Sequence, residues 1–336
     1  MIYKRLWQRP ISLFFAIVLL CTCMNYPKEI RADSVEEVVA VQKTINGKQS
    51  DEKRKIIYMV MDNSDSMYYD KNADGGKSPQ KKWCQVKYSM QVFASMMNFD
   101  NGDELRIYPM HEISIGKGGP KVETYLSINS SEDLNKISMI YSSGTTRGTP
   151  LDTVSVAYED LKKVETEDSA DKWLVILTDG AFTTKRENGK GNREMDDSES
   201  EPFIKAMATQ DINVEYFQIR NKVDSEPVNE NTYHKIQKQD NSEGITEGLV
   251  TACNQIFQRD IFTVEDIDGD KITFDVSMKK IFVLAQGNGI SINGFGGQLA
   301  ENSQPIKYSE LSGVYGEKIG AIVDDNLEGV VTTFTD

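Results

Sequence analysis

The residues best suited to chemistry form an oxygen-rich stretch, Asp62-Asn63-Ser64-Asp65-Ser66, which directly follows an apolar run. The spacing Asp-x-Ser-x-Ser places one carboxylate and two hydroxyls at alternate positions of a loop, where all three can converge on one point. Hard cations such as Mg²⁺ take about six oxygen ligands, so these three groups are too few by themselves. We therefore expect other loops to supply further oxygens to a shared cation site.

Two later segments carry suitable oxygens. Thr149 stands at the start of a helix that Pro150 opens, and Asp179 ends a second apolar run. Thr145, in an earlier Gly-Thr pair, competes with Thr149, but we prefer Thr149 because of its place at the helix start. The plainer alternative for all these residues is a set of turn caps and loop hydroxyls that bond to the backbone.

Apolar runs before these loops predict the strands of a doubly wound α/β sheet. Residues 56–61 and 173–177 are apolar on both faces, which is typical of central parallel strands covered by helices on each side. Further strands are expected at 105–110, 122–128 and 212–219, and helices at 83–97, 149–164, 201–210 and 244–259, with a polar loop over 181–200 and a short helical piece near Tyr233. Strands that alternate with helices predict a mainly parallel sheet. Ligands of such sheets bind outside the carboxyl ends of the strands, where the strand order reverses.

The character of the sequence changes after Asp260. Residues 261–336 contain short alternating apolar runs divided by turns rich in Gly and Asn, which predict a small all-β domain, sandwich-like in architecture. The last expected strand runs almost to Asp336, so the chain either continues or borrows a strand from elsewhere.

The N-terminal segment reads as an export signal. Lys4, Arg5 and Arg9 precede an apolar run over 11–24, which is short for a membrane-spanning helix. We assign residues 1–32 to a signal peptide, with an uncleaved anchor as the alternative, and residues 33–54 to a linker or short helix. The protein is then secreted or anchored at the outer face of a membrane.

Composition excludes several classes of function. The 336 residues carry a formal net charge of −14, which removal of residues 1–32 would take to −18, so nucleic acid is a poor partner. His111 and His234 are the chain's only histidines and do not suffice for a multi-histidine metal site. Cys84 and Cys253, the two cysteines outside the signal, are either bridged or buried as free thiols.

Three pieces of the sequence, taken together, resemble the von Willebrand factor A domain family. They are YMVMDNSDSM (58–67), SGTTRGTPL (143–151) and WLVILTDG (173–180), and the resemblance covers about residues 55–260. It implies a metal-ion-dependent adhesion site, with Mg²⁺ as the expected ion and Mn²⁺ or Ca²⁺ as alternatives. Arg147 departs from the family, which often has Gly there. The ligands that the resemblance implies, some of them through water, are Asp62, Ser64, Ser66, Thr149 and Asp179.

These features predict an extracytoplasmic binding or adhesion protein rather than an enzyme. A carboxylate from a partner protein would complete the shell of the bound ion, and the N-terminal segment offers a route to the membrane. The alternative is an assembly or regulatory subunit of a cell-envelope complex. A metal-assisted hydrolase with Asp62 or Asp179 as nucleophile is less favoured, because no general acid or oxyanion arrangement accompanies them.

Overall fold

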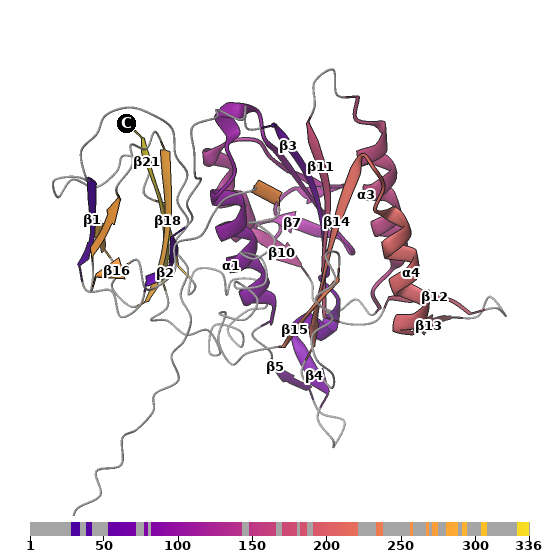
Figure 1. Ribbon diagram of the computed structural model, residues 1–336. Coiled ribbons are helices and arrows are strands. Elements are labelled where there is room, and N and C mark those ends of the chain that lie inside the picture. Colours follow the sequence, from indigo (N-terminus) through magenta and orange to yellow (C-terminus); the bar gives the residue numbers. More distant parts are fainter. Residues whose placement is uncertain are drawn as a thin grey trace, which may run out of the picture.

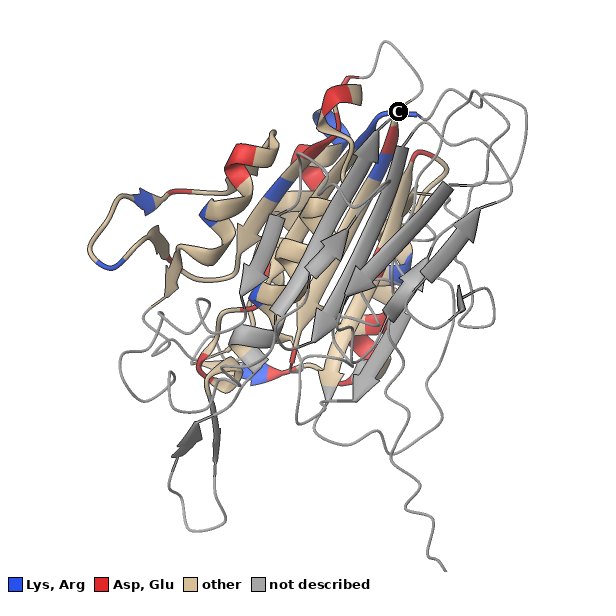
Figure 2. Ribbon diagram, turned by 90° about the vertical axis from the view of Figure 1, so that its left-hand side faces the viewer, with Lys and Arg blue, Asp and Glu red and all other residues tan. Residues whose placement is uncertain are grey.

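The structure is a computed structural model of the 336-residue chain, in which helices cover both faces of a central sheet (Figure 1). It describes residues 28–33, 38–41, 53–71, 77–79, 82–142, 148–165, 170–179, 182–186, 191–220, 233–237, 256–257, 267–268, 271–274, 280–287, 291–293, 304–307 and 328–335. In the view of Figure 2, acidic residues are spread over several helices and strands with Lys and Arg between them. No helix within the described residues is long and apolar enough to cross a bilayer.

The main sheet has six strands among the described residues, in the order β15-β14-β11-β3-β6-β9. Five run parallel, and the edge strand β9 is antiparallel to β6. The bounds are β3 (Lys55–Met61), β6 (Glu104–Pro109), β9 (Leu126–Ile128), β11 (Asp171–Thr178), β14 (Ile212–Arg220) and β15 (Tyr233–Gln237). The chain builds outward from β3 through β6 to β9, then crosses back to β11, so the strand order reverses between β3 and β11. The predicted α/β fold class is confirmed.

Helices pack on both faces of this sheet, as the apolar strands require. α1 (Lys82–Ser95) covers one face, and α3 (Leu151–Lys163) and α4 (Asp197–Met207) cover the other (Figure 1). Alternate residues of β3 enter opposite core clusters: Ile57, Met59 and Met61 on the α1 side, and Ile56, Tyr58 and Val60 on the α3 and α4 side. Each buried large apolar side chain contributes about 1.5–3 kcal/mol, which fixes the strand that carries Asp62 at its end.

Two local expectations need correction. The segment near Tyr233, expected to be helical, is strand β15 and pairs with β14. The expected polar loop over 181–200 contains the hairpin of β12 (Thr183–Lys185) and β13 (Asn192–Glu194), and α4 begins at Asp197 rather than at residue 201. Of the helix expected over 244–259, only residues 256–257 lie within the described residues, and they are helical.

Small elements connect the main strands. They are η1 (Asp65–Met67), β4 (Tyr69–Lys71), β5 (Lys77–Pro79), η2 (Phe99–Asn101), β7 (Ile113–Ile115), β8 (Lys121–Val122), η3 (Ser131–Leu134), α2 (Asn135–Ser138) and β10 (Ile140–Ser142). β10, β7 and β8 form a small antiparallel sheet, which lies between the end of β6 and the segment that leads to α3.

The expected C-terminal strands form two further antiparallel sheets together with strands from the N-terminal segment. One has the order β16 (Ile267–Asp268), β17 (Lys271–Phe274), β1 (Lys28–Asp33) and β19 (Ser291–Asn293). The other has the order β2 (Val38–Val41), β18 (Lys280–Gly287), β21 (Glu328–Thr335) and β20 (Gln304–Lys307).

These sheets therefore combine strands from both ends of the sequence. β2 lies within the segment 33–54, so this segment is not wholly a linker or helix, and β1 begins inside the assigned signal segment 1–32. The domain boundaries themselves stay predictions.

Candidate metal centre

Asp62 anchors the site from the carboxyl end of β3. Its backbone N–H donates to Leu177 O of β11 at 2.9 Å, and the residue is fully buried. One carboxylate oxygen, Oδ1, accepts the Ser64 N–H at 2.8 Å. The other, Oδ2, accepts the hydroxyls of Thr178 at 2.7 Å and Thr149 at 3.3 Å. A buried carboxylate needs such donors, and these three fix its orientation.

The two serines connect this loop to the neighbouring strand. The hydroxyl oxygens of Ser64 and Ser66 lie 2.9 Å apart. Ser66 Oγ donates to Asp179 Oδ1 at 2.8 Å, and Asp179 directly follows β11. Ser64 is buried, whereas Ser66 and Asp179 are half-buried, so this end of the network reaches the surface.

Thr149 brings the third loop. It is buried and precedes Pro150, the residue before α3, as the predicted helix start requires. Its carbonyl accepts the Thr183 N–H at 2.8 Å. Gly148 has a φ of +88°, a left-handed conformation that favours glycine, and this turn directs Thr149 towards Asp62. Thr145, the competing threonine, lies outside the described residues, as do Arg147 and Cys253 and the side chain of Cys84.

The five residues implied as ligands thus lie in one network of contacts, drawn from three loops. The side-chain donor set is two carboxylates and three hydroxyls, the hard oxygens that Mg²⁺ prefers. Adjacent ligands of an octahedral Mg²⁺ shell are about 2.9 Å apart when the metal–oxygen distance is about 2.05 Å. The Ser64–Ser66 and Ser66–Asp179 oxygen separations of 2.9 and 2.8 Å fit that spacing. Ordinary hydrogen bonds have the same lengths, so the metal itself stays a prediction.

Hydroxyls are essential to this candidate centre. Among the described residues, no three or more His, Cys, Asp and Glu side chains are grouped so that they could hold an ion. An ion at the network above would therefore depend on serine and threonine oxygens as well as on the carboxylates of Asp62 and Asp179.

Sequence reasoning missed three residues of the site. Thr178 belongs to the quoted Thr-Asp-Gly piece but received no role, and its buried hydroxyl donates to Asp62. Asn63, which is not among the predicted ligands, is buried and pairs with the backbone of His111. The ring of His111, which belongs to no predicted site, lies 2.7 Å from Gly148 O through its Nε2. No motif in the sequence marks Asn63 or His111.

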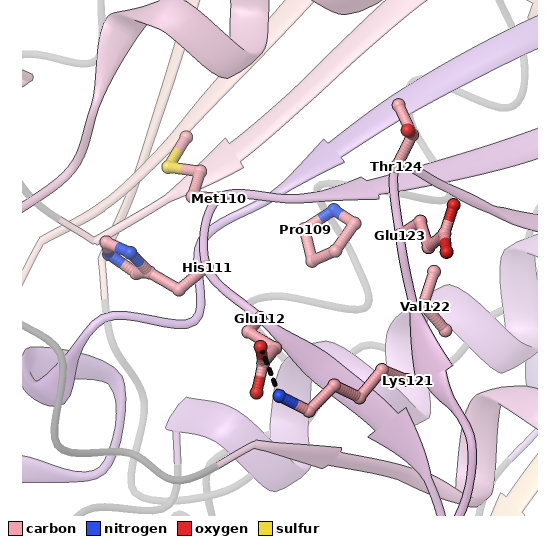
Figure 3. A pocket seen from close by; sticks show the side chains of 8 residues that line it. All are labelled: Pro109, Met110, His111, Glu112, Lys121, Val122, Glu123 and Thr124. Carbon is pink, nitrogen blue, oxygen red and sulfur yellow. Dashed lines mark hydrogen bonds and ion pairs between the residues drawn. The ribbon is translucent and has the colours of Figure 1, made fainter.

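A pocket of about 400 Å³ lies next to this network, at the carboxyl end of β6 (Figure 3). His111 lines it and also contacts Gly148, so the pocket adjoins the loop that carries Thr149. Glu112 and Lys121 form an exposed ion pair at 2.8 Å on one side. The lining residues are Pro109, Met110, His111, Glu112, Lys121, Val122, Glu123 and Thr124.

A cluster of tyrosines around Arg106 lies on the sheet beside this pocket. The Arg106 guanidinium carbon lies 4.9 Å from the Tyr58 ring centre and 4.6 Å from that of Tyr125. Burial raises the pKa of Tyr58 to about 12 and raises the pKa of Tyr108 as well. These two phenols therefore stay neutral at physiological pH and add no negative charge to this edge of the sheet.

Comparisons with known proteins give distant structural likenesses alone. No family model and no curated protein matches the sequence. Proximal thread matrix protein 1 from the mussel byssus is 10% identical with a TM-score of 0.38, over 60% of this chain and 48% of its own. The pilus adhesin SpaC from Lactobacillus rhamnosus GG is 12% identical with a TM-score of 0.40, over 94% of this chain and 42% of its own.

The chain thus spans about half or less of the length of these proteins. At such identities and TM-scores the likeness carries no argument about function. What defines the class of this protein is its own geometry. It is a doubly wound α/β protein whose oxygen-rich loops meet where the strand order reverses, with additional antiparallel sheets.

Proposed function

We propose that this chain is an extracytoplasmic binding protein that captures a carboxylate of a partner protein at a Mg²⁺ ion. Asp62, Ser64, Ser66, Thr149 and Asp179 would hold the ion, with Mn²⁺ and Ca²⁺ as alternatives. The observation that carries this proposal is the meeting of three loops in one set of contacts, with the Ser66 hydroxyl 2.8 Å from Asp179 across the strand reversal.

The residues of the chain divide the work of such a site. Thr178 and the Ser64 N–H hold the buried Asp62 carboxylate in one orientation, so its oxygens are preorganised. Ser66 and Asp179 are half-buried, which leaves this side of the network accessible to a partner. A bound divalent ion supplies positive charge and an open coordination position, which an acidic side chain can fill.

A bound divalent ion would also offset the negative charge of the chain near the site. A chain with a net charge of −14 repels acidic groups, so an acidic partner side chain needs a local positive charge to bind. The pocket beside the network then gives room to the residues that flank the acidic side chain of the partner.

Calorimetric titration of the full chain with MgCl₂ and with MnCl₂ tests the proposal. We expect one site, which Asp62→Ala abolishes, and a weakened site in Ser66→Ala, which removes only a half-buried hydroxyl. Asp211→Ala is the matched control, because Asp211 is exposed and precedes β14 at the amino ends of the parallel strands, away from the candidate site. The proposal fails if the chain binds neither ion, or if Asp62→Ala and Ser66→Ala bind as the unmodified chain does.

The second candidate is an assembly or regulatory subunit that holds an envelope partner permanently. Its support is that the oxygens of the network already satisfy one another by hydrogen bonds, an arrangement compatible with docking that needs no ion. Capture of a membrane partner in the presence of a chelator favours this candidate, whereas release by the chelator favours the metal-dependent one. We propose no enzymatic activity for either, which a hydrolase screen with Mg²⁺ checks.

A further inference from the structure

Asn63 and His111 form a two-point hydrogen-bonded pair between the loops that follow β3 and β6. Asn63 Nδ2 donates to His111 O at 3.0 Å, and the His111 N–H donates to Asn63 Oδ1 at 2.8 Å. Asn63 is only 1% exposed and lies between Asp62 and Ser64 in the sequence. Its amide is thus committed to the backbone of another loop rather than to solvent.

The imidazole of His111 extends this pairing to a third loop. Its Nε2 lies 2.7 Å from Gly148 O, and a carbonyl only accepts, so this nitrogen carries a proton and donates. Gly148 directly precedes Thr149, whose hydroxyl reaches Asp62. The Gly148 turn is confined from the other side as well, because a Cβ added there would lie 3.1 Å from Thr183 Oγ1.

The same pair holds both flanks of the segment 143–147. Asn63 Nδ2 also lies 3.2 Å from the hydroxyl of Ser142, the last residue of β10, and His111 holds Gly148. Ser142 and Gly148 are the described residues on either side of that segment. The Asn63–His111 pair therefore contacts the chain both at the end of β10 and at the residue before Thr149.

We propose that Asn63 and His111 are positioning residues, which set the distance between Thr149 and Asp62 without touching the ion. The inference rests on the proposed metal site for its effect on ions, but the positioning of the loop can be measured without one. Mg²⁺ demands a nearly ideal octahedron, whereas Ca²⁺ accepts a looser shell of six to eight oxygens. Loss of the His111 contact should therefore weaken Mg²⁺ binding more than Ca²⁺ binding.

The experiment compares the full chain with His111→Ala and His111→Gln by calorimetry with MgCl₂ and, separately, with CaCl₂. Removal of a direct hydrogen-bonding partner of a metal ligand weakens metal binding by about 10- to 100-fold. His111 acts one residue away, through Gly148 O, so we expect a loss of about tenfold for Mg²⁺ in His111→Ala, the lower end of that range, and a smaller loss for Ca²⁺. His111→Gln restores Mg²⁺ binding, because its side-chain amide can donate to Gly148 O.

Amide hydrogen exchange without any ion gives the independent readout. His111→Ala should speed exchange at the Thr183 N–H, which donates to Thr149 O, and leave β3 and β11 protected. Unchanged exchange and unchanged ion affinities in His111→Ala overturn the inference, as does equal weakening of both ions with faster exchange across the core strands. If the unmodified chain binds no ion while Thr183 exchange still rises, the positioning stands and the proposed metal function fails.

Discussion

The hydroxyl of Ser66 lies 2.8 Å from a carboxylate oxygen of Asp179, although 113 positions separate the two residues in the chain. They follow β3 and β11, the neighbouring parallel strands between which the strand order reverses. Chain connections leave this point on opposite sides, so the loops here are free to converge. One contact therefore reports on both the topology of the sheet and the candidate site.

The buried hydroxyl of Thr178 should prove important for stability. Thr178→Val keeps the shape of the side chain but removes the 2.7 Å hydrogen bond to Asp62 Oδ2. A hydrogen bond to a charged group contributes about 1.5–3 kcal/mol to the free energy of unfolding, and we expect a loss near the lower end, because Thr149 still donates to the same oxygen. Urea denaturation measures the loss, and Thr178→Ser, which keeps the hydroxyl, should recover most of it. Equal destabilisation by both variants would attribute the effect to packing instead.

A partly buried ion pair at the amino ends of β3 and β11 should affect stability without affecting the site. Lys55 Nζ, with a side chain 4% exposed, lies 2.5 Å from Asp171 Oδ2 at the amino ends of β3 and β11. Asp171→Asn leaves this ammonium without its charged partner. Because the Asp171 side chain is 20% exposed, we expect a loss of about 2 kcal/mol, below the full cost of breaking a buried pair.

Urea denaturation measures this loss, with the exposed Asp211→Asn as control. Calorimetry on the same variants should give unchanged Mg²⁺ affinity, because Asp171 lies at the amino ends of the parallel strands, whereas Asp62 lies at their carboxyl ends. Weaker Mg²⁺ binding by a folded Asp171→Asn protein would contradict the independence of the ion pair at the amino ends of the strands from the candidate site at their carboxyl ends.

The stability of the start of α4 should fall in acid. The Arg193 guanidinium and the Asp196 backbone N–H lower the pKa of Glu199 from 4.5 to about 2. Because the pKa falls on folding, the stabilisation by Glu199 is fully present above about pH 4.5 and is lost as the pH drops towards 2. A carbon-detected NMR titration of the Glu199 carboxyl in Arg193→Ala should show the pKa move back towards its ordinary value. An unmoved pKa would assign the shift to the backbone contact alone.

The N-terminal strands should be needed by the C-terminal ones. A chain without residues 1–41 lacks β1 and β2, so β17, β19 and β18 lose pairing partners. We expect faster hydrogen exchange in these three strands and unchanged protection in β3 and β11. A chain without residues 1–27 is the control and should match the full chain.

The same pairing limits where the predicted signal peptide can be cut. A cut after Ala32 would remove nearly all of β1, so mass spectrometry should find a mature N-terminus no later than Lys28. A mature protein that begins at Asp33 and still protects β17 would contradict this expectation.

Local patterns sufficed to predict the parts of the fold with strong burial. β3 and β11 are apolar on both faces, a pattern typical of central parallel strands that helices cover on each side. The loops after β3 and β11 could be assigned to one site because both carry side-chain oxygens, and because the carboxyl ends of neighbouring parallel strands lie on the same side of the sheet. Thr149 could be placed because Pro150 opens the helix that follows it.

Other features depend on partners that are distant in the sequence. β15 is short and its two apolar residues, Tyr233 and Ile236, do not alternate with polar ones, so its identity as a strand comes from pairing with β14. β2 is paired with β18, whose residues lie more than two hundred positions later. His111 contacts Gly148 because the end of β6 and the start of α3 lie close together in the fold. No periodicity in the sequence predicts this contact.

Pairing between the two ends of the sequence also bears on biosynthesis. β1 and β2 leave the ribosome early, but the strands that complete their sheets come after residue 266. Residues 55–220 can meanwhile close most of the parallel sheet, since domains generally fold as units during synthesis. The nascent chain therefore carries two segments, those of β1 and β2, without pairing partners while the parallel sheet can already fold. These unpaired segments are where a chaperone would best prevent aggregation.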